Sequence, residues 1–120
     1  MIIGIGTDIL AIDRMERVCA NARFVERWFT GPERELFTGR RIETIAGNFC
    51  CKEAAAKALG CGFKGFMPDS VEVLRDDNGA PVVNLYGVAK IVAERLNIKK
   101  IHASITHDGL YAAAFVIMEG

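Results

Sequence analysis

The sequence predicts an α+β domain in which helices pack on one side of a mainly antiparallel sheet. Three observations indicate this fold class. Two pairs of short strand-like segments are each joined by Asp and Gly residues that are typical of hairpin turns. The longer segments between them carry apolar residues at steps of three and four, as amphipathic helices do. Linkers, repeats and low-complexity tracts are missing, so residues 1–120 are expected to form a single domain.

In the first half of the chain, one strand is expected to precede three helices. Residues 2–7 alternate Ile and Gly around a strand. Residues 13–28 are expected to form one helix, because their apolar side chains keep helical spacing. The Thr-Gly-Pro-Glu sequence at 30–33 is typical of a helix start and predicts a short helix over 33–37. Residues 41–59 are expected to form the long central helix, which ends at a glycine.

The second half of the chain is expected to contain two hairpins with a helix between them. Residues 70–75 and 81–85 are predicted to pair across an Asp-Asn-Gly turn. Residues 100–106 and 111–118 are predicted to pair across a His-Asp-Gly turn. Residues 87–96 form the predicted helix, and its inward face is expected to consist of Val88, Ile91, Val92 and Leu96. These patterns do not decide the order of the strands.

Composition and charge exclude several classes of protein. The formal net charge is +0, whereas general nucleic-acid binders carry a clear basic excess, so no nucleic-acid partner is expected. The chain starts with an apolar strand rather than a targeting leader. Its longest apolar run, residues 111–118, is too short to cross a bilayer, so no membrane association is expected. The four cysteines lack Cys-x-x-Cys spacing, which argues against zinc and for free thiols in a reducing cytoplasm.

Two carboxylates far apart in sequence are candidates for a metal site. Asp8 ends an apolar strand, where a partly desolvated carboxylate needs a hydrogen-bonding, cationic or metal partner. The alternative is that Asp8 caps the next helix. Glu53 lies four residues before Lys57 on the central helix, so the two share a face, and the alternative there is a surface ion pair. Two carboxylates with waters and phosphate oxygens make an ordinary magnesium site.

Two further segments are candidates to contact a phosphorylated ligand. Strand alternation places His102, Ser104 and Thr106 on one face of the strand over 100–106, where a histidine is either a packed, hydrogen-bonded residue or a functional one. The glycine-rich loop 60–65 follows the central helix and is able to offer backbone N–H groups to a phosphate. Because glycine loops are common, this loop does not identify a phosphate site by itself.

Arginines are concentrated in one part of the chain. Seven arginines and no lysine lie between residues 14 and 41. Guanidinium groups bind carboxylates and phosphates at two points, so a face built from them suits an anionic partner. The alternative is a solvated helix face whose arginines pair with neighbouring glutamates.

Taken together, these segments resemble a known family. Residues 3–9 read Ile-Gly-Ile-Gly-Thr-Asp-Ile, residues 49–62 contain Lys-Glu-Ala-Ala-Ala-Lys-Ala, and residues 78–81 read Asn-Gly-Ala-Pro. Residues 102–108 read His-Ala-Ser-Ile-Thr-His-Asp and precede Tyr-Ala-Ala-Ala at 111–114. In this order, over nearly the whole chain, they resemble the holo-acyl-carrier-protein synthases, the small bacterial-type class of 4′-phosphopantetheinyl transferases. The combination is specific, whereas each piece alone is not.

The resemblance implies a fold and a reaction. The fold is that of the phosphopantetheinyl transferases. The reaction transfers the 4′-phosphopantetheine group of coenzyme A to a serine of apo acyl carrier protein, which gives holo acyl carrier protein and adenosine 3′,5′-bisphosphate. The resemblance also implies a magnesium-dependent, cytoplasmic homotrimer with active sites between adjacent subunits.

The resemblance further implies roles for individual residues. Asp8 and Glu53 would hold magnesium, and Lys57 would stabilise or protonate the leaving phosphate, so these three are the expected catalytic residues. The base that takes the serine proton stays open, with a metal-ordered water relaying to Glu53 or Asp8 as the first choice. The residues expected to bind coenzyme A are Lys52, Lys57, Gly60, Gly62, Lys64, Gly79, Pro81, His102 and Thr106. The acidic acyl carrier protein is expected to dock on Arg14, Arg17, Arg23 and Arg27.

At one position the chain departs from the family pattern. The family usually carries a basic residue just before the Phe of the central helix, where this chain has Asn48. That basic residue is expected to hold a coenzyme A phosphate, so Asn48→Arg is expected to tighten coenzyme A binding if the site is open. The cations that could replace it are Arg40, Arg41, Lys52 and Lys64.

Two other functions fit part of the sequence. A non-catalytic coenzyme A- or nucleotide-binding module would keep the glycine loop and the basic groups without needing both carboxylates. A small structural oligomer would use the charged residues as ion pairs at subunit contacts and would not depend on magnesium.

Overall fold

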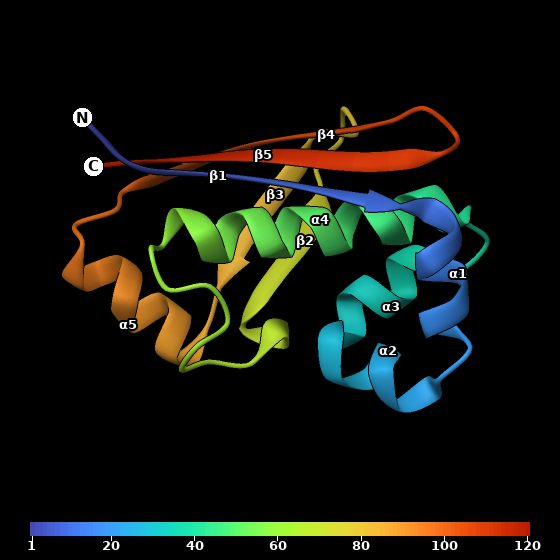
Figure 1. The fold of residues 1–120 in the computed structure, drawn as a ribbon. Coiled ribbons are helices and arrows are strands. Elements are labelled where there is room, and N and C mark those ends of the chain that lie inside the picture. Colours follow the sequence, from blue (N-terminus) through green and yellow to red (C-terminus); the bar gives the residue numbers. More distant parts are fainter.

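The computed structural model describes residues 1–120 and has a three-stranded antiparallel sheet as its upper layer in Figure 1. The strands are β1 (Ile2–Ala11), β5 (Tyr111–Glu119) and β4 (Lys100–His107), in the order β1-β5-β4. The first and last strands of the chain are therefore neighbours. Asp8 lies opposite Ala114 in this pairing. The prediction of a mainly antiparallel sheet is confirmed.

Helix α4 (Ile42–Ala58) runs along the inner face of this sheet and forms the centre of the core. Its buried surface is rich in alanine, and its closest neighbour is β1. A Cβ atom on Gly6 would overlap the carbonyl oxygen of Ala54, and one on Gly4 would overlap that of Ala58. The glycines of β1 therefore let the helix backbone lie directly on the strand.

The remaining elements surround α4. A separate two-stranded sheet, β2 (Val71–Arg75) and β3 (Pro81–Leu85), follows the short 3-10 helix η1 (Pro68–Ser70). Helix α5 (Gly87–Arg95) lies at one end of the molecule in Figure 1. At the other end lie α1 (Ile12–Cys19), α2 (Ala22–Trp28) and α3 (Gly31–Phe37). Both predicted hairpins are confirmed, as is the capping box of α3 at Thr30 and Glu33. No helix has both the length and the apolar character needed to cross a membrane.

The first strand and the first helix differ from the prediction. The strand continues to Ala11 rather than ending near residue 7. The single helix expected over 13–28 is two helices, because Asn21 begins a new one. The Asn21 Oδ1 atom accepts hydrogen bonds from the backbone N–H groups of Arg23 and Phe24, at 3.0 and 3.4 Å. The apolar residues keep helical spacing across this break, so the spacing alone did not reveal it.

The expected inward face of α5 is wrong for most of its residues. Val88, Ile91 and Leu96 are exposed, and Val92 is half-buried. The small residues Ala89 and Ala93 are buried instead. A helix that packs closely uses small side chains at its contact, and this close packing leaves the larger apolar residues outside.

Candidate functional site

Asp8, Glu53 and Lys57 meet at the edge between β1 and α4. On α4, Ala54 and Ala58 lie four residues apart and face the glycines of β1. Glu53 and Lys57 form the adjacent row of side chains, so the same contact places them beside β1. The Lys57 Nζ atom donates to the backbone oxygen of Thr7 at 2.9 Å and lies 3.4 Å from the Asp8 Oδ1 atom. Lys57 thus pairs with Asp8 rather than with Glu53.

Asp8 does not cap a helix. Helix α1 begins after Ala11, and no side chain caps its first N–H groups. The Asp8 carboxylate lies on the inner side of β1, with its side chain 19% exposed. The carboxylate is therefore partly desolvated and close to a cation, as the strand position predicts.

The electrostatics of Glu53 indicate a second carboxylate nearby. Burial raises the pKa of Glu53, and the negative charge of Asp8 raises it further, while Lys57 and Arg14 act in the opposite direction. A carboxylate whose pKa is raised by a neighbouring carboxylate favours a bound cation beside it. No cluster of three acidic, His or Cys side chains that could hold a metal ion is present, and Asp8 and Glu53 are two hard oxygen donors. This donor set fits magnesium, which commonly keeps waters and phosphate oxygens.

The thiols beside this site are chemically quiet. Cys50 is buried behind Asp8 and donates to the backbone oxygen of Ala112 at 3.4 Å. Burial, followed by the charge of Asp8, raises the pKa of Cys50 to about 12. Burial likewise raises the pKa of Cys51 to about 12. The cysteines are all free, as expected.

Lys52 and Asn48 are not available to a ligand, which corrects two expectations. The side chain of Lys52 is 0% exposed, and its Nζ atom lies 2.6 Å from the Glu33 Oε1 atom. Asn48 is also fully buried, and its Nδ2 atom donates to the Glu33 Oε2 atom and the Val73 oxygen, at 3.1 and 2.8 Å. Position 48 therefore faces a buried carboxylate rather than an open phosphate site.

The glycine loop uses two of the N–H groups expected to be free for a phosphate. The N–H of Gly60 donates to the oxygen of Lys57 at 2.9 Å, and that of Gly62 donates to the oxygen of Ala56 at 3.1 Å. Both glycines have positive φ and close the end of α4. Any contact that they make with a ligand must therefore use their open surface, where an added Cβ would meet nothing within 4 Å. Lys64 is exposed in the same loop.

Four other residues that were expected to bind coenzyme A do not lie beside Asp8 within one copy of the chain. Gly79 and Pro81 lie at the tip of the β2–β3 hairpin, where the N–H of Gly79 donates to the oxygen of Asp76 at 3.0 Å. His102 and Thr106 lie on the exposed outer face of the sheet, opposite the α4 side. The His102 Nε2 atom lies 3.0 Å from the Glu119 Oε1 atom.

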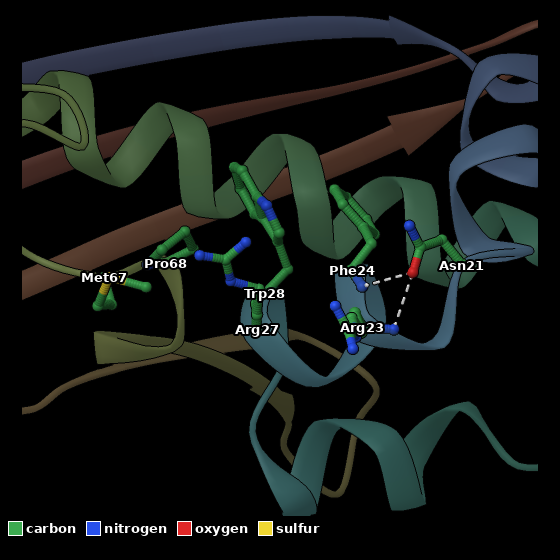
Figure 2. A pocket seen from close by; sticks show the side chains of 7 residues that line it. All are labelled: Asn21, Arg23, Phe24, Arg27, Trp28, Met67 and Pro68. Atoms are coloured by element: carbon green, nitrogen blue, oxygen red, sulfur yellow. Dashed lines mark hydrogen bonds between the residues drawn. The ribbon is translucent and has the colours of Figure 1, made fainter.

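The expected docking arginines lie on two helices. Arg14 and Arg17 belong to α1, where Arg17 pairs with Asp13 at 3.6 Å. Arg23 and Arg27 belong to α2 and border a cleft of about 410 Å³ that Figure 2 shows from close by. Its other lining residues are Asn21, Phe24, Trp28, Met67 and Pro68.

An aromatic cluster connects this cleft to α4. The rings of Trp28 and Phe49 are stacked with centroids 4.5 Å apart, and Phe63 meets Trp28 edge-on at 5.3 Å. Phe49 lies one turn before Glu53 on α4. The cleft and the Asp8 site are therefore on parts of the fold that pack against each other.

Comparison with known proteins decides the family. The model of the 4′-phosphopantetheinyl transferase superfamily matches residues 4–116, which is nearly the whole chain. This chain belongs to the 4′-phosphopantetheinyl transferase superfamily. The match covers both β1 with Asp8 and α4 with Glu53 and Lys57, so all parts of the Asp8 site lie within the transferase domain.

Relatives within this transferase superfamily cover the chain from end to end. A holo-[acyl-carrier-protein] synthase from Lachnoclostridium phytofermentans is 43% identical over 119 residues, which are 99% of this chain and 97% of the relative. The crystal structure of holo-[acyl-carrier-protein] synthase from Neisseria meningitidis has a TM-score of 0.91 at 30% identity and covers 100% of both chains. The Helicobacter pylori synthase in complex with coenzyme A has a TM-score of 0.84 at 32% identity, over 96% of this chain and 99% of that one.

The structural roles of three residues beside Asp8 and Glu53 were missed by sequence reasoning. Gly4 and Gly6 set the contact between β1 and α4, and their only signal was alternation with isoleucine. Arg14 was assigned to docking alone, yet its charge lowers the pKa of Glu53. The helical pattern gave no sign of this, because only the turn from β1 into α1 brings Arg14 back toward α4.

Proposed function

We propose that this chain transfers the 4′-phosphopantetheine group of coenzyme A to a serine of apo acyl carrier protein, giving holo acyl carrier protein and adenosine 3′,5′-bisphosphate. The observation that carries the proposal is the meeting of Asp8, Glu53 and Lys57 at the edge of β1 and α4. Two carboxylates and an ammonium are the groups needed to hold a cation and a diphosphate together. The names and complete coverage of the relatives support the same activity.

Asp8 and Glu53 are the proposed magnesium ligands. Their partial burial and mutual repulsion give them reason to share a cation. A magnesium ion held there would neutralise charge on the diphosphate of coenzyme A and supply electrostatic stabilisation during displacement at phosphorus. Lys57 would exchange part of its contact with Asp8 for a phosphate oxygen, because more than half of its side chain, 53%, is exposed.

The residues of the site account for the proton and the leaving group. The serine oxygen forms a bond to the phosphorus that carries the pantetheine arm, and the bond from that phosphorus to the bridging oxygen breaks. Glu53 or Asp8 is the proposed acceptor of the serine proton through one water, because a carboxylate that would also hold the metal takes the proton by relay rather than directly. Lys57 donates to the leaving phosphate and compensates its new charge. The open surface at Gly60 and Gly62 and the exposed Lys64 extend the binding surface from Lys57.

The chain is proposed to act as a homotrimer with active sites between adjacent subunits. The outer face of the three-stranded sheet exposes Ile5, Ile9, Tyr111 and Phe115, a patch that copies of the chain are able to bury. His102 and Thr106 share this face, so association would offer them to a neighbour's Asp8 site rather than to their own. Phe115→Glu is expected to yield monomers by native mass spectrometry and to abolish transfer. A trimeric or fully active Phe115→Glu variant would argue against this interface.

The acyl carrier protein is proposed to dock on α1 and α2. The carrier proteins of this family are expected to be acidic, and Arg23 and Arg27 line a cleft that also contains the rings of Phe24 and Trp28 (Figure 2). Charge complementarity would steer the encounter, and the aromatic floor would supply contact area. Free cysteines support a reducing compartment, so the reaction is proposed to take place in the cytoplasm.

Incubation with coenzyme A and apo carrier protein, followed by intact-mass measurement, tests the proposal. The expected result is a mass gain of one phosphopantetheine on the carrier protein, dependent on magnesium. Coenzyme A binding without any mass gain would favour the non-catalytic binding module. A stable oligomer that neither binds coenzyme A nor responds to magnesium would favour the structural alternative.

A further inference from the structure

Lys52 precedes the proposed catalytic Glu53 in sequence, yet its side chain points into a different part of the fold. Its ammonium group is fully buried and has three oxygen acceptors, which matches the three protons that it can donate. The acceptors are the Glu33 carboxylate, the Pro68 oxygen at 3.2 Å and the Val71 oxygen. The ring of Phe29 covers the ammonium with its centroid 5.4 Å away.

Two of these acceptors lie where the glycine loop rejoins the fold. The segment 59–67 leaves the end of α4 and returns through Pro68 to β2, which begins at Val71. Gly60, Gly62 and Gly65 in this segment have φ values of 89°, 59° and 124°, conformations that glycine adopts freely. The N–H groups of Gly60 and Gly62 fix the near end of the loop to α4, and the rings of Phe63 and Phe66 pack on each other in its middle. The ammonium of Lys52 joins the far end of the loop to the middle of α4.

Stability alone gives little reason to keep this ion pair. Burial lowers the pKa of Lys52 and raises that of Glu33, because each charged group has lost its hydration. The charge of each group acts on the pKa of the other in the opposite direction. Replacing a buried pair by apolar residues of similar volume is often neutral or stabilising. Glu33 is itself held by the N–H groups of Thr30 and Val73, at 3.1 and 3.3 Å, so it presents a fixed anchor to the ammonium.

We propose that Lys52 is a positioning residue that holds the 59–67 loop, and with it Lys64, in the geometry that binds coenzyme A. The inference rests on the proposed function, because that function assigns the loop to coenzyme A. Lys52 acts through the carbonyl groups of Pro68 and Val71 and never touches the ligand.

The test uses the trimer-competent full chain with Glu33→Gln and Lys52→Met combined. This double variant leaves no unpaired buried charge but removes the ammonium contacts to the loop. The KM for coenzyme A is expected to rise about ten-fold, the scale of one lost charge-assisted hydrogen bond, while the KM for carrier protein stays within about two-fold. Exchange of the Ser70 amide, which donates to the Met67 oxygen at the end of the loop, is expected to accelerate, while that of β1 and β5 stays unchanged. Lys52→Gln in the Glu33→Gln background keeps one donor and is expected to restore part of the affinity.

The matched control is Asn48→Ala, which removes another buried polar group on the same row of α4. Asn48 contacts Glu33 and Val73 but not the loop, so this variant is expected to lose stability without a change in the KM for coenzyme A. Wild-type KM and loop exchange in the folded double variant would overturn the proposal, and so would an equal rise in KM for Asn48→Ala.

The wild-type protein supplies a second measurement if the double variants do not fold. Lys52 holds the far end of the loop through the Pro68 and Val71 oxygens, so the Ser70 amide, which donates to the Met67 oxygen at that end, is expected to be at least as protected as the Gly62 amide, which donates to the Ala56 oxygen at the near end. A Ser70 amide that exchanges faster than the Gly62 amide overturns the proposal. Intact-mass transfer by the wild-type protein tests the proposed function separately, because loop exchange is measured without any substrate.

Discussion

Asp8→Asn removes one negative charge from the site and keeps the size of the side chain. The Asp8–Lys57 pair is 3.4 Å long, and the Lys57 side chain is 53% exposed, so the lost interaction is a solvent-screened one. Such pairs contribute about 0.2–1 kcal/mol, and the variant is therefore expected to unfold within about 4 °C of the wild-type protein. Transfer is expected to depend on Asp8 much more strongly, because Asp8 is a proposed ligand of the metal that stabilises transition-state charge by several kcal/mol. Weaker metal binding is expected to slow the reaction on the order of 10²–10³-fold.

The assay for Asp8→Asn is initial rate by intact mass over a series of magnesium concentrations. The apparent magnesium requirement is expected to rise, with partial recovery of rate at high magnesium. Asp13→Asn is the matched control, because Asp13 also pairs with a cation, Arg17, at 3.6 Å, but lies outside the metal site. Both variants are assayed at saturating carrier protein, since Arg17 lies on the proposed docking helix. Wild-type turnover of Asp8→Asn at limiting magnesium would refute the reasoning, as would a loss of activity explained by unfolding.

Five further outcomes are expected. Arg27→Glu should raise the KM for carrier protein about ten-fold or more at low salt and less at high salt, whereas the control Arg95→Glu on α5 should leave it unchanged; equal effects of the two variants would argue against docking on α2. Arg14→Glu should raise the KM for both carrier protein and coenzyme A, because the charge of Arg14 acts on Glu53. Gly6→Ala should cost about 1–3 kcal/mol in urea unfolding because its Cβ meets the Ala54 oxygen, whereas Gly31→Ala meets only the Arg34 side chain at 3.9 Å and should be nearly neutral. Asn48→Arg should lower Tm without improving discrimination between coenzyme A and dephospho-coenzyme A; improved discrimination would show that position 48 does reach the 3′-phosphate. Glu53→Gln in EDTA should be more stable than the wild-type protein at pH 8, because burial and Asp8 disfavour the ionised Glu53 that the amide replaces. This advantage should shrink as pH falls through the raised folded-state pKa and be gone below the unfolded value of about 4.3. Chemical denaturation along this pH series measures it, and a constant difference would contradict the sign.

Local chemistry made much of the fold and part of the site predictable. The capping box at Thr30, the Asp-Asn-Gly turn and the i,i+4 spacing of Glu53 and Lys57 each depend on residues close in sequence, and each is confirmed. The inward face predicted for α5 from its apolar spacing was wrong, because the helix packs through Ala89 and Ala93 instead.

The burial of Lys52 and Asn48 was not predictable from a single sequence. Both lie on the same helix as Glu53, and only the tertiary position of Glu33 shows that their side chains join a buried network rather than an exposed site. The pairing of β1 with β5 was equally hidden, since the hydrophobic pattern of each strand fits several partners.

That pairing has a consequence for synthesis of the chain. The strand that carries Asp8 is made first, but its partner is the last strand, and Asp8 lies opposite Ala114. A nascent chain therefore exposes an unpaired, isoleucine-rich strand edge throughout translation, which is the kind of segment that chaperones bind and that aggregates when they are scarce. The Asp8 site cannot assemble until β5 has left the ribosome, so a chain truncated before residue 111 is expected to retain Glu53 and Lys57 on a helix but to have no transferase activity at all.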